Sequence, residues 1–230
     1  MLTMAGSKVS TLSLSPLTRT LAMNPTGFDT HSHREFEIFS YIVSGELQHN
    51  DSMRNTEILG RGAIQMTSAG TGISHSEFAH GSGPVHFLQI WSIPHTPGLK
   101  PAYYTRHFSD ADKLNKWARV VAPVGAEGVK KTREATGPAP VHSALTMYAS
   151  LVEPGVRLER EIKGKKGYVH VVMTSGYQEG AGAGASVRLT GVDVPETLRE
   201  GDGAYLAESG VLVVQNVGET RAEVVVFDLE

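Results

Sequence analysis

The sequence predicts an all-β protein made of two tandem β-barrels with one short helix between them. Three observations support this fold class: short runs rich in β-branched and aromatic residues, turn residues roughly every 8–12 positions, and a helical pattern confined to one stretch. This spacing is typical of sandwiches and barrels, and it disfavours βαβ units, in which longer helices separate the strands. The 230 residues are enough for one large domain or two of ordinary size.

Strand patterns recur on both sides of a central region that is rich in proline and glycine. Residues 36–43 (FEIFSYIV) and 85–93 (VHFLQIWSI) are the strongest patterns of the first half. The central region, residues 94–140, contains the helical pattern at residues 110–119 (DADKLNKWAR). A second series of strand patterns begins at Val141, so we place the boundary between two similar halves in the central region.

The N-terminal residues 1–24 form an atypical leader that we expect to be disordered. The first 28 residues contain Lys8 and Arg19 but no acidic residue before Asp29, which is a weak version of an organelle transit peptide. An unstructured tail or an incorrect gene start is the favoured interpretation.

Composition excludes several classes of function. The chain has no cysteine, which excludes disulfide frameworks, thiolate zinc sites, iron–sulfur clusters and cysteine nucleophiles, and fits a reducing compartment. The net charge of −3 disfavours direct binding to nucleic acid, which usually requires a basic excess. No apolar run approaches the roughly 20 residues that cross a bilayer, so we expect no membrane partner.

Two histidine-containing pairs in the first half predict a metal site. Residues i and i+2 of a strand point to the same face, with Cα atoms about 6.5–7 Å apart, so the imidazoles of His31 and His33 converge on one ion. His75 and Glu77 repeat this spacing 44 residues later. If a barrel brings the two strands together, three nitrogens and one carboxylate oxygen surround one divalent transition metal.

The other histidines have a simpler interpretation. The chain has 10 histidines, and for His49, His80, His95 and His107 we keep the simplest interpretation, that of a surface or hydrogen-bonded histidine. For Glu77 the simpler interpretation is a solvated acidic side chain near a loop. Two pairs with the same spacing, each beside a glycine-rich turn, favour the metal site.

The chain resembles the pirin family of the cupin superfamily. The matching stretches are GFDTHSHREFE at 27–37, YIVSGE at 41–46, HNDS at 49–52, SAGTGISHSE at 68–77 and HFLQIW at 86–91. The resemblance extends from about Gly27 to the end and is strongest through Phe108. It implies a bicupin, with two RmlC-like jelly-roll barrels, and metal binding by His31, His33, His75 and Glu77 in residues 25–120.

The resemblance also leaves departures and a reserve ligand. Glu37 lies near the glutamate that many other cupins use, so it is a reserve candidate. Residues 1–24 do not resemble the family's N-terminal segment, which supplies strands to the first barrel. In residues 121–230 the segment Glu153–Glu159 stands where a second histidine pair would lie, and His142 and His170 are isolated, so we expect no metal ligands there.

The resemblance implies a chemistry as well. Pirin-like proteins cleave flavonols such as quercetin with dioxygen and release carbon monoxide. This favours a quercetin 2,3-dioxygenase-like oxidoreductase that uses iron, with Cu, Ni, Zn or Mn left open. Glu77 is the candidate catalytic residue, acting as the general base that takes the flavonol proton.

Two alternatives stay open at the level of sequence. The family includes nuclear proteins described as iron-dependent, redox-sensing co-regulators of transcription, which bind protein partners and are not enzymes. The other alternative is a metal-loaded bicupin without activity. The expected location is cytoplasmic, nuclear or both.

Overall fold

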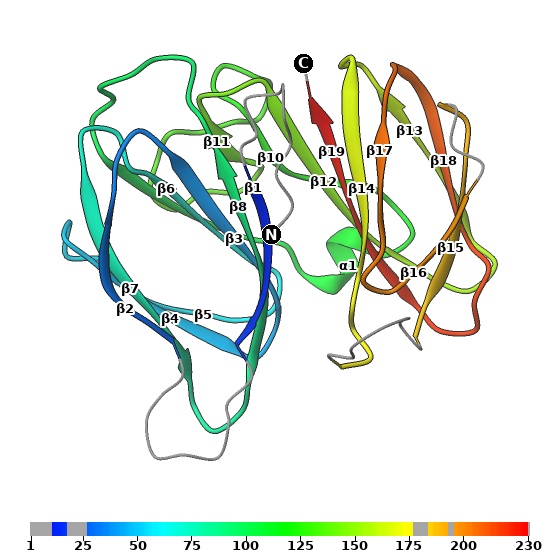
Figure 1. Ribbon diagram of the computed structural model, residues 1–230, viewed down its shortest axis with the longest axis horizontal. Coiled ribbons are helices and arrows are strands. Elements are labelled where there is room, and N and C mark those ends of the chain that lie inside the picture. Colours follow the sequence, from blue (N-terminus) through cyan, green and yellow to red (C-terminus); the bar gives the residue numbers. More distant parts are fainter. Residues whose placement is uncertain (1–10, 18–26, 177–183, 193–195, 230) are drawn as a thin grey trace. The chain divides into compact units, whose positions relative to one another are not determined.

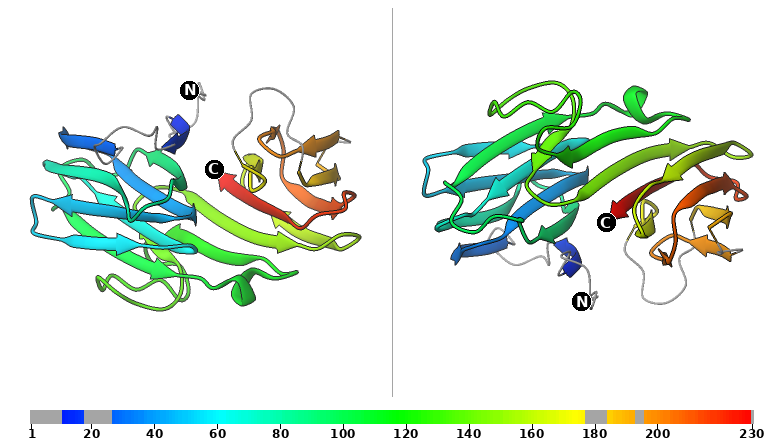
Figure 2. Two further views of the ribbon diagram at one scale, coloured as in Figure 1. Left: turned by 90° about the horizontal axis from the view of Figure 1, so that it is seen from below. Right: turned by 90° about the horizontal axis from the view of Figure 1, so that it is seen from above.

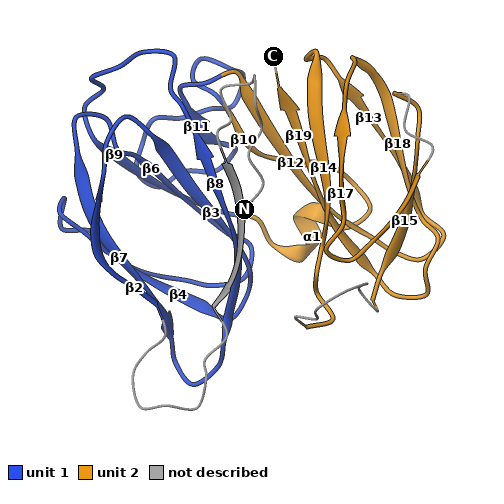
Figure 3. Cartoon of the chain, viewed as in Figure 1, with its two compact units in different colours: residues 1–107, 123–143 blue, residues 108–122, 144–230 orange. Residues whose placement is uncertain are grey.

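A computed structural model describes residues 11–17, 27–176, 184–192 and 196–229 (Figure 1). In this part of the chain almost every element is a β-strand, and one short helix, α1 (Asp110–Lys113), lies between β9 and β10. The strands fall into two compact units, each built from β-sheets (Figure 3). The predicted all-β fold with two tandem barrels and one short helix is therefore confirmed.

The two units are not continuous in sequence. Unit 1 contains residues 1–107 and 123–143, and unit 2 contains residues 108–122 and 144–230. The sequence analysis treated each barrel as one uninterrupted stretch, whereas residues 123–143 return to unit 1 after the chain has begun unit 2.

Unit 1 consists of two antiparallel sheets that face each other (Figures 1 and 2). The first sheet has the order β1 (Thr11–Leu17), β8 (Val85–Ser92), β3 (Glu37–Ser44), β6 (Ala63–Ser68) and β9 (Ala102–His107). The second has the order β2 (Gly27–His33), β7 (Ile73–His80), β4 (Glu46–Asp51) and β5 (Thr56–Leu59). A short strand, β11 (Ala139–Val141), contacts β6 and β9.

The interior of unit 1 is apolar at one end and polar at the other. Ile42 and Phe87 of the first sheet pack with Leu47 and Ala79 of the second in one buried cluster. Buried and half-buried residues alternate along β7, so the residues two and four positions before Ala79 share its inward face. One of these is Glu77, which places the predicted site inside the barrel.

Unit 2 repeats the two-sheet arrangement around aliphatic residues. Its larger sheet runs in the order β10 (Ala118–Pro123), β12 (Leu145–Val152), β19 (Ala222–Leu229), β14 (Lys166–Val172) and β17 (Gly203–Leu206). The smaller sheet runs in the order β13 (Arg157–Ile162), β18 (Gly210–Asn216), β15 (Ser186–Thr190) and β16 (Glu196–Arg199). Between them lies a cluster of buried valine and leucine side chains, among them Val171, Leu189 and Val224.

The helix is shorter than the predicted stretch of residues 110–119. It begins with a capping box, in which the Ser109 hydroxyl accepts the N–H of Asp112 and the Asp112 carboxylate accepts the N–H of Ser109. It ends at Lys113, whose side chain is fully buried and lies 3.7 Å from a Glu223 carboxylate oxygen. Asn115 then adopts a left-handed conformation with φ of 52°, which turns the chain toward β10.

Part of the predicted leader forms a strand. Within residues 1–24, strand β1 pairs antiparallel with β8, with Thr11 opposite Trp91 and Leu17 opposite Val85. The first sheet thus has an edge strand from this segment. The rest of the predicted leader, residues 1–10 and 18–24, lies outside the described residues. Among the helices of the described chain, none is long and apolar enough to span a membrane.

Candidate metal centre

Strands β2 and β7 bring three histidines together. His31 and His75 are opposite each other in the antiparallel pair, and His33 lies two residues further along β2. The ring centroids are 4.7 Å apart for His31 and His33, 4.6 Å for His31 and His75, and 4.9 Å for His33 and His75. One nitrogen from each ring lies within 4.8 Å of the other two, a spacing suited to one cation.

A β-bulge in β2 sets the position of His31. Phe28 is opposite Glu77 and His31 is opposite His75, so β2 has one more residue than β7 over this interval. Within the bulge, Nδ1–H of His31 donates to the carbonyl oxygen of Asp29 at 2.7 Å. A carbonyl can only accept, so the proton is on Nδ1 and the Nε2 lone pair is available to a cation.

The other two imidazoles have nitrogens without partners. Nε2 of His33 and both ring nitrogens of His75 are buried and make no hydrogen bond within the described chain. Burial lowers the pKa of His75 to about 4, and burial together with the nearby His31 lowers the pKa of His33. Neutral imidazoles with free lone pairs are the form that binds metal, so this donor set fits a divalent transition metal.

Glu77 presents a buried carboxylate beside the histidines. Its Oε1 accepts Nε2–H of Gln65 at 3.2 Å, and its Oε2 accepts Nε2–H of Gln89 at 2.8 Å. Burial raises the pKa of Glu77, but hydrogen bonding and the electrostatic influence of the neighbouring His49 and His75 outweigh it and hold the pKa below its ordinary value. Glu77 is therefore an anion with both oxygens oriented by amide donors.

The carboxylate of Glu77 lies on the His49 side of His75. Ligand atoms of His49, His75 and Glu77 form a second group within 4.8 Å, which shares His75 with the first group. The structure thus brings three of the predicted ligands into one group, and it places the fourth, Glu77, next to one of them. A single ion held by all four stays a prediction.

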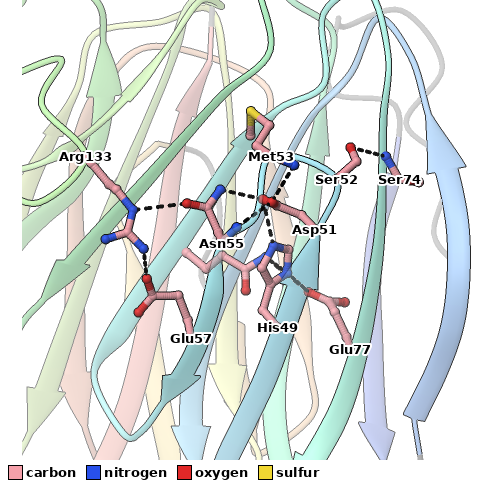
Figure 4. Close-up of polar contacts among 10 residues, drawn as sticks. His49, Asp51, Ser52, Met53, Asn55, Glu57, Ser74, Glu77 and Arg133 are labelled. Carbon is pink, nitrogen blue, oxygen red and sulfur yellow. Dashed lines mark hydrogen bonds and ion pairs between the residues drawn. The ribbon is translucent and has the colours of Figure 1, made fainter.

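His49 is the residue of this site that the sequence analysis missed. It was interpreted as a surface or hydrogen-bonded histidine. It is hydrogen-bonded, but it is also fully buried and lies opposite Glu77 in the β4–β7 pair. Its Nε2–H donates to Oδ2 of Asp51 at 3.3 Å (Figure 4). Its Nδ1 accepts Nε2–H of Gln65 at 3.1 Å. The ring stacks on Tyr103 at a centroid distance of 5.0 Å. The sequence feature that could have indicated His49 as part of the site is its i, i+2 spacing from Asp51.

The reserve ligand Glu37 has a different partner. It is fully buried, and its carboxylate accepts the backbone N–H of His142 at 2.7 Å and contacts Nδ1 of the same residue at 2.7 Å. It belongs to neither group of candidate ligands in the described chain. Among the remaining histidines, His95 and His107 are exposed.

Aromatic residues and a pocket border the histidines. Trp91 lies edge-on to His33 at a centroid distance of 4.8 Å, and Phe28 lies 6.2 Å from His31 and is 38% exposed. A pocket of about 460 Å³ opens beside His33. This volume is in the range that accommodates small organic ligands. The pocket is lined by Ser32, His33, Arg34, Ser52, Gly72, Ile73 and Ser74.

The chain is similar in sequence to a protein family and to several known proteins. A family model described as Pirin matches residues 8–92. A putative quercetin 2,3-dioxygenase of Zymomonas mobilis is 29% identical over 201 residues, which cover 87% of this chain and 76% of the relative. The quercetin 2,3-dioxygenase of Escherichia coli is 38% identical over 109 residues, covering 47% of this chain and 46% of that protein. The chain therefore matches less than half the length of this second relative.

Solved structures agree with this placement. YhhW from Escherichia coli superposes with a TM-score of 0.71 at 25% identity, covering 89% of this chain and 76% of that chain. A bacterial pirin YhhW in complex with nickel(II), also from Escherichia coli, gives a TM-score of 0.69 at 26% identity, covering 88% and 76%. Both similarities extend over most of the chain.

Proposed function

The chain is a pirin-like protein with the two-barrel cupin fold, and from this premise we propose that it is a metal-dependent dioxygenase of quercetin-type flavonols. One observation carries the proposal: three buried or half-buried imidazoles converge with unpartnered nitrogens, and an oriented carboxylate and a pocket lie beside them. The names of relatives from Zymomonas mobilis and Escherichia coli support the substrate class.

We propose that His31, His33 and His75 hold one divalent transition metal, with Glu77 as the fourth ligand. The nickel(II) complex of a bacterial pirin supports a divalent ion in a site of this kind. Iron is our first candidate, and Cu, Ni, Zn and Mn suit the same nitrogen and oxygen donors. When bound, such an ion supplies Lewis acidity, which lowers the pKa of a hydroxyl group that approaches it.

The residues around the ligands would bind and orient the substrate. The pocket leads to His33, and the exposed edge of Phe28 and the ring of Trp91 offer apolar contact to a flat aromatic molecule. Glu77 would accept the proton of the flavonol hydroxyl, because its oxygens are already held in place by Gln65 and Gln89. The deprotonated flavonol is electron-rich and reacts with dioxygen.

The test is to measure metal content and flavonol cleavage on the same purified protein. Elemental analysis gives the bound metal, and the quercetin absorbance band is followed under air with iron, copper or nickel supplied. We expect loss of the band that requires both metal and oxygen and is absent from a His33→Ala variant. Intact quercetin in the presence of fully loaded protein would refute the enzyme and favour the iron-dependent regulator.

A further inference from the structure

Arg133 lies in residues 123–143, the segment that returns to unit 1 after the chain has begun unit 2. The buried guanidinium of Arg106 holds this segment on β9, because it donates to three of its backbone carbonyl groups. These carbonyl oxygens are those of Lys130 at 2.5 Å, Arg133 at 3.1 Å and Thr132 at 3.3 Å. The N–H of Thr105 also donates to the carbonyl oxygen of Arg133, at 2.8 Å. The backbone that carries the Arg133 side chain is thus fixed to the barrel.

The Arg133 side chain makes four contacts in unit 1, one of which is an ion pair with the neighbouring Glu134 at 2.8 Å. Its Nε–H donates to Oδ1 of Asn55 at 3.1 Å, and its terminal nitrogen forms an ion pair with Glu57 (Figure 4). Its Cζ lies over the ring of Tyr103, 5.8 Å from the centroid. The planar guanidinium serves as a hydrogen-bond donor and as a cation over an aromatic face at the same time.

The contact with Asn55 connects Arg133 to His49 through two residues, Asn55 and Asp51. Since Oδ1 of Asn55 accepts from Arg133, the amide nitrogen of Asn55 is turned toward Asp51 and donates to its Oδ2 at 2.7 Å. The same oxygen accepts Nε2–H of His49 at 3.3 Å. The Asp51 carboxylate can only accept, so it favours this orientation of the Asn55 amide, and Arg133 reinforces the orientation by donating to Oδ1 from the other side.

The contact with Tyr103 connects Arg133 to His49 through one residue. Tyr103 is buried between Arg133 and His49, with its ring 5.0 Å from the imidazole and inclined by 21° to it. Both routes from Arg133 therefore end on the same imidazole. Nδ1 of His49 accepts from the Gln65 amide, which donates its other hydrogen to Glu77.

We propose that Arg133 is a positioning residue for the metal centre, holding His49 and, through Gln65, the carboxylate of Glu77 in the orientation that a bound ion requires. The proposal deepens the proposed function and rests on it for its consequence in catalysis. Arg133 itself is 44% exposed and touches none of the candidate ligands. Its effect is therefore expected to be smaller than the 10–100-fold loss typical of a residue bonded directly to a ligand.

Four variants separate positioning from charge and from stability. Arg133→Ala removes all four contacts, and Arg133→Lys keeps the positive charge beside Glu57 but lacks the planar guanidinium group. Glu57→Gln removes the ion pair and leaves the Asn55 and Tyr103 contacts of Arg133. Arg221→Ala is a matched control in unit 2, where Arg221 pairs with Glu153 at 3.3 Å at similar exposure.

Each variant is loaded with Cu(II), and its electron paramagnetic resonance spectrum and dissociation constant, from chelator competition, are compared with those of the wild type. We expect Arg133→Ala and Arg133→Lys to shift the spectrum and to weaken binding by about threefold to tenfold. The Glu57→Gln and Arg221→Ala variants should match the wild type. Equal spectra and affinities for Arg133→Ala and Glu57→Gln would overturn the proposal, as would full rescue by lysine.

A metal-free measurement keeps this test separate from that of the proposed function. Long-range ¹H–¹⁵N correlation spectra of the apoprotein report the tautomer of each histidine, and we expect His49 to carry its proton on Nε2 in the wild type. In Arg133→Ala this signal should shift or broaden. Should the wild type bind no metal, the proposed function fails, and an unchanged His49 signal would refute the positioning network as well.

Discussion

Replacing Glu77 with glutamine probes the carboxylate without changing its size. The two carboxylate oxygens accept one amide N–H each, from Gln65 at 3.2 Å and from Gln89 at 2.8 Å. A glutamine side chain has one oxygen and one NH₂ group, so one of these donors must face another donor. The variant therefore keeps the packing of the site and loses one buried hydrogen bond together with the negative charge.

The cost in stability follows from this loss. Leaving a buried donor without an acceptor costs about 1–3 kcal/mol. Part of this is offset because the variant no longer buries a charge. At about 2–4 °C per kcal/mol for a chain of this size, we expect the unfolding temperature to fall by at most roughly 12 °C.

The effect on catalysis is expected to be much larger than the effect on metal binding. The three imidazoles remain in Glu77→Gln, so part of the metal is retained. A general base contributes about 10²–10⁴-fold to a rate, so quercetin turnover at equal metal loading should fall by at least about 100-fold. The assay is loss of the quercetin band, normalised to metal content from elemental analysis.

Glu200→Gln is the matched control for this prediction. Glu200 is also buried and accepts hydrogen bonds, from Thr174 and Ser175, but it lies in unit 2. We expect its replacement to lower the unfolding temperature and to leave metal content and turnover unchanged. Wild-type turnover by Glu77→Gln at equal metal loading would remove Glu77 from the mechanism.

Three further predictions follow from the structure. In His33→Ala, bound metal should fall to about a tenth of the wild-type content or less, because one of three nitrogen donors is lost. Replacing the exposed His107 is the control and should leave the metal content from elemental analysis unchanged. Chelation should lower the unfolding temperature in calorimetry, since free ion at 100 times its Kd stabilises the folded state by about 2.7 kcal/mol; an unchanged temperature would contradict the site. Burial raises the pKa of Glu200, but hydrogen bonds, chiefly from Ser175, hold this pKa below its ordinary value. The stability that Glu200 contributes is therefore present above about pH 4.3 and is lost as the pH falls through the folded-state pKa. Urea unfolding should therefore show a difference between wild type and Glu200→Gln at neutral pH that disappears in acid, and a difference that persists there would refute this origin.

The centre of the site could be predicted because it depends on local strand geometry. His31 and His33 share a face at i, i+2 whatever the rest of the fold, and the same holds for His75 and Glu77. The position of Glu77 relative to the histidines was harder to predict. It depends on a bulge in β2 that contains Asp29, and nothing in the sequence marks a bulge there.

The surroundings of Glu77 required information that a single sequence does not contain. His49 lies opposite Glu77 only because of the register between β4 and β7, and Gln65 and Gln89 come from strands of the facing sheet. Register and sheet packing arise from contacts that are distant in sequence. The same reason explains Arg133, which lies in the central region rich in proline and glycine and is placed by hydrogen bonds from Arg106 to backbone carbonyl groups.

The carboxylate of Glu77 joins the two sheets of unit 1 at the polar end of their interior. It projects from β7 of one sheet and is held by amides from β6 and β8 of the other. Hydrophobic contacts such as those of the apolar cluster have no preferred direction, whereas a hydrogen bond of about 3 Å depends on both distance and angle. A buried donor that loses its acceptor is costly, so the two amide bonds that orient Glu77 also favour one alignment of the two sheets. It follows that a substitution at Gln65 or Gln89 should disturb the metal centre and the packing of the barrel together.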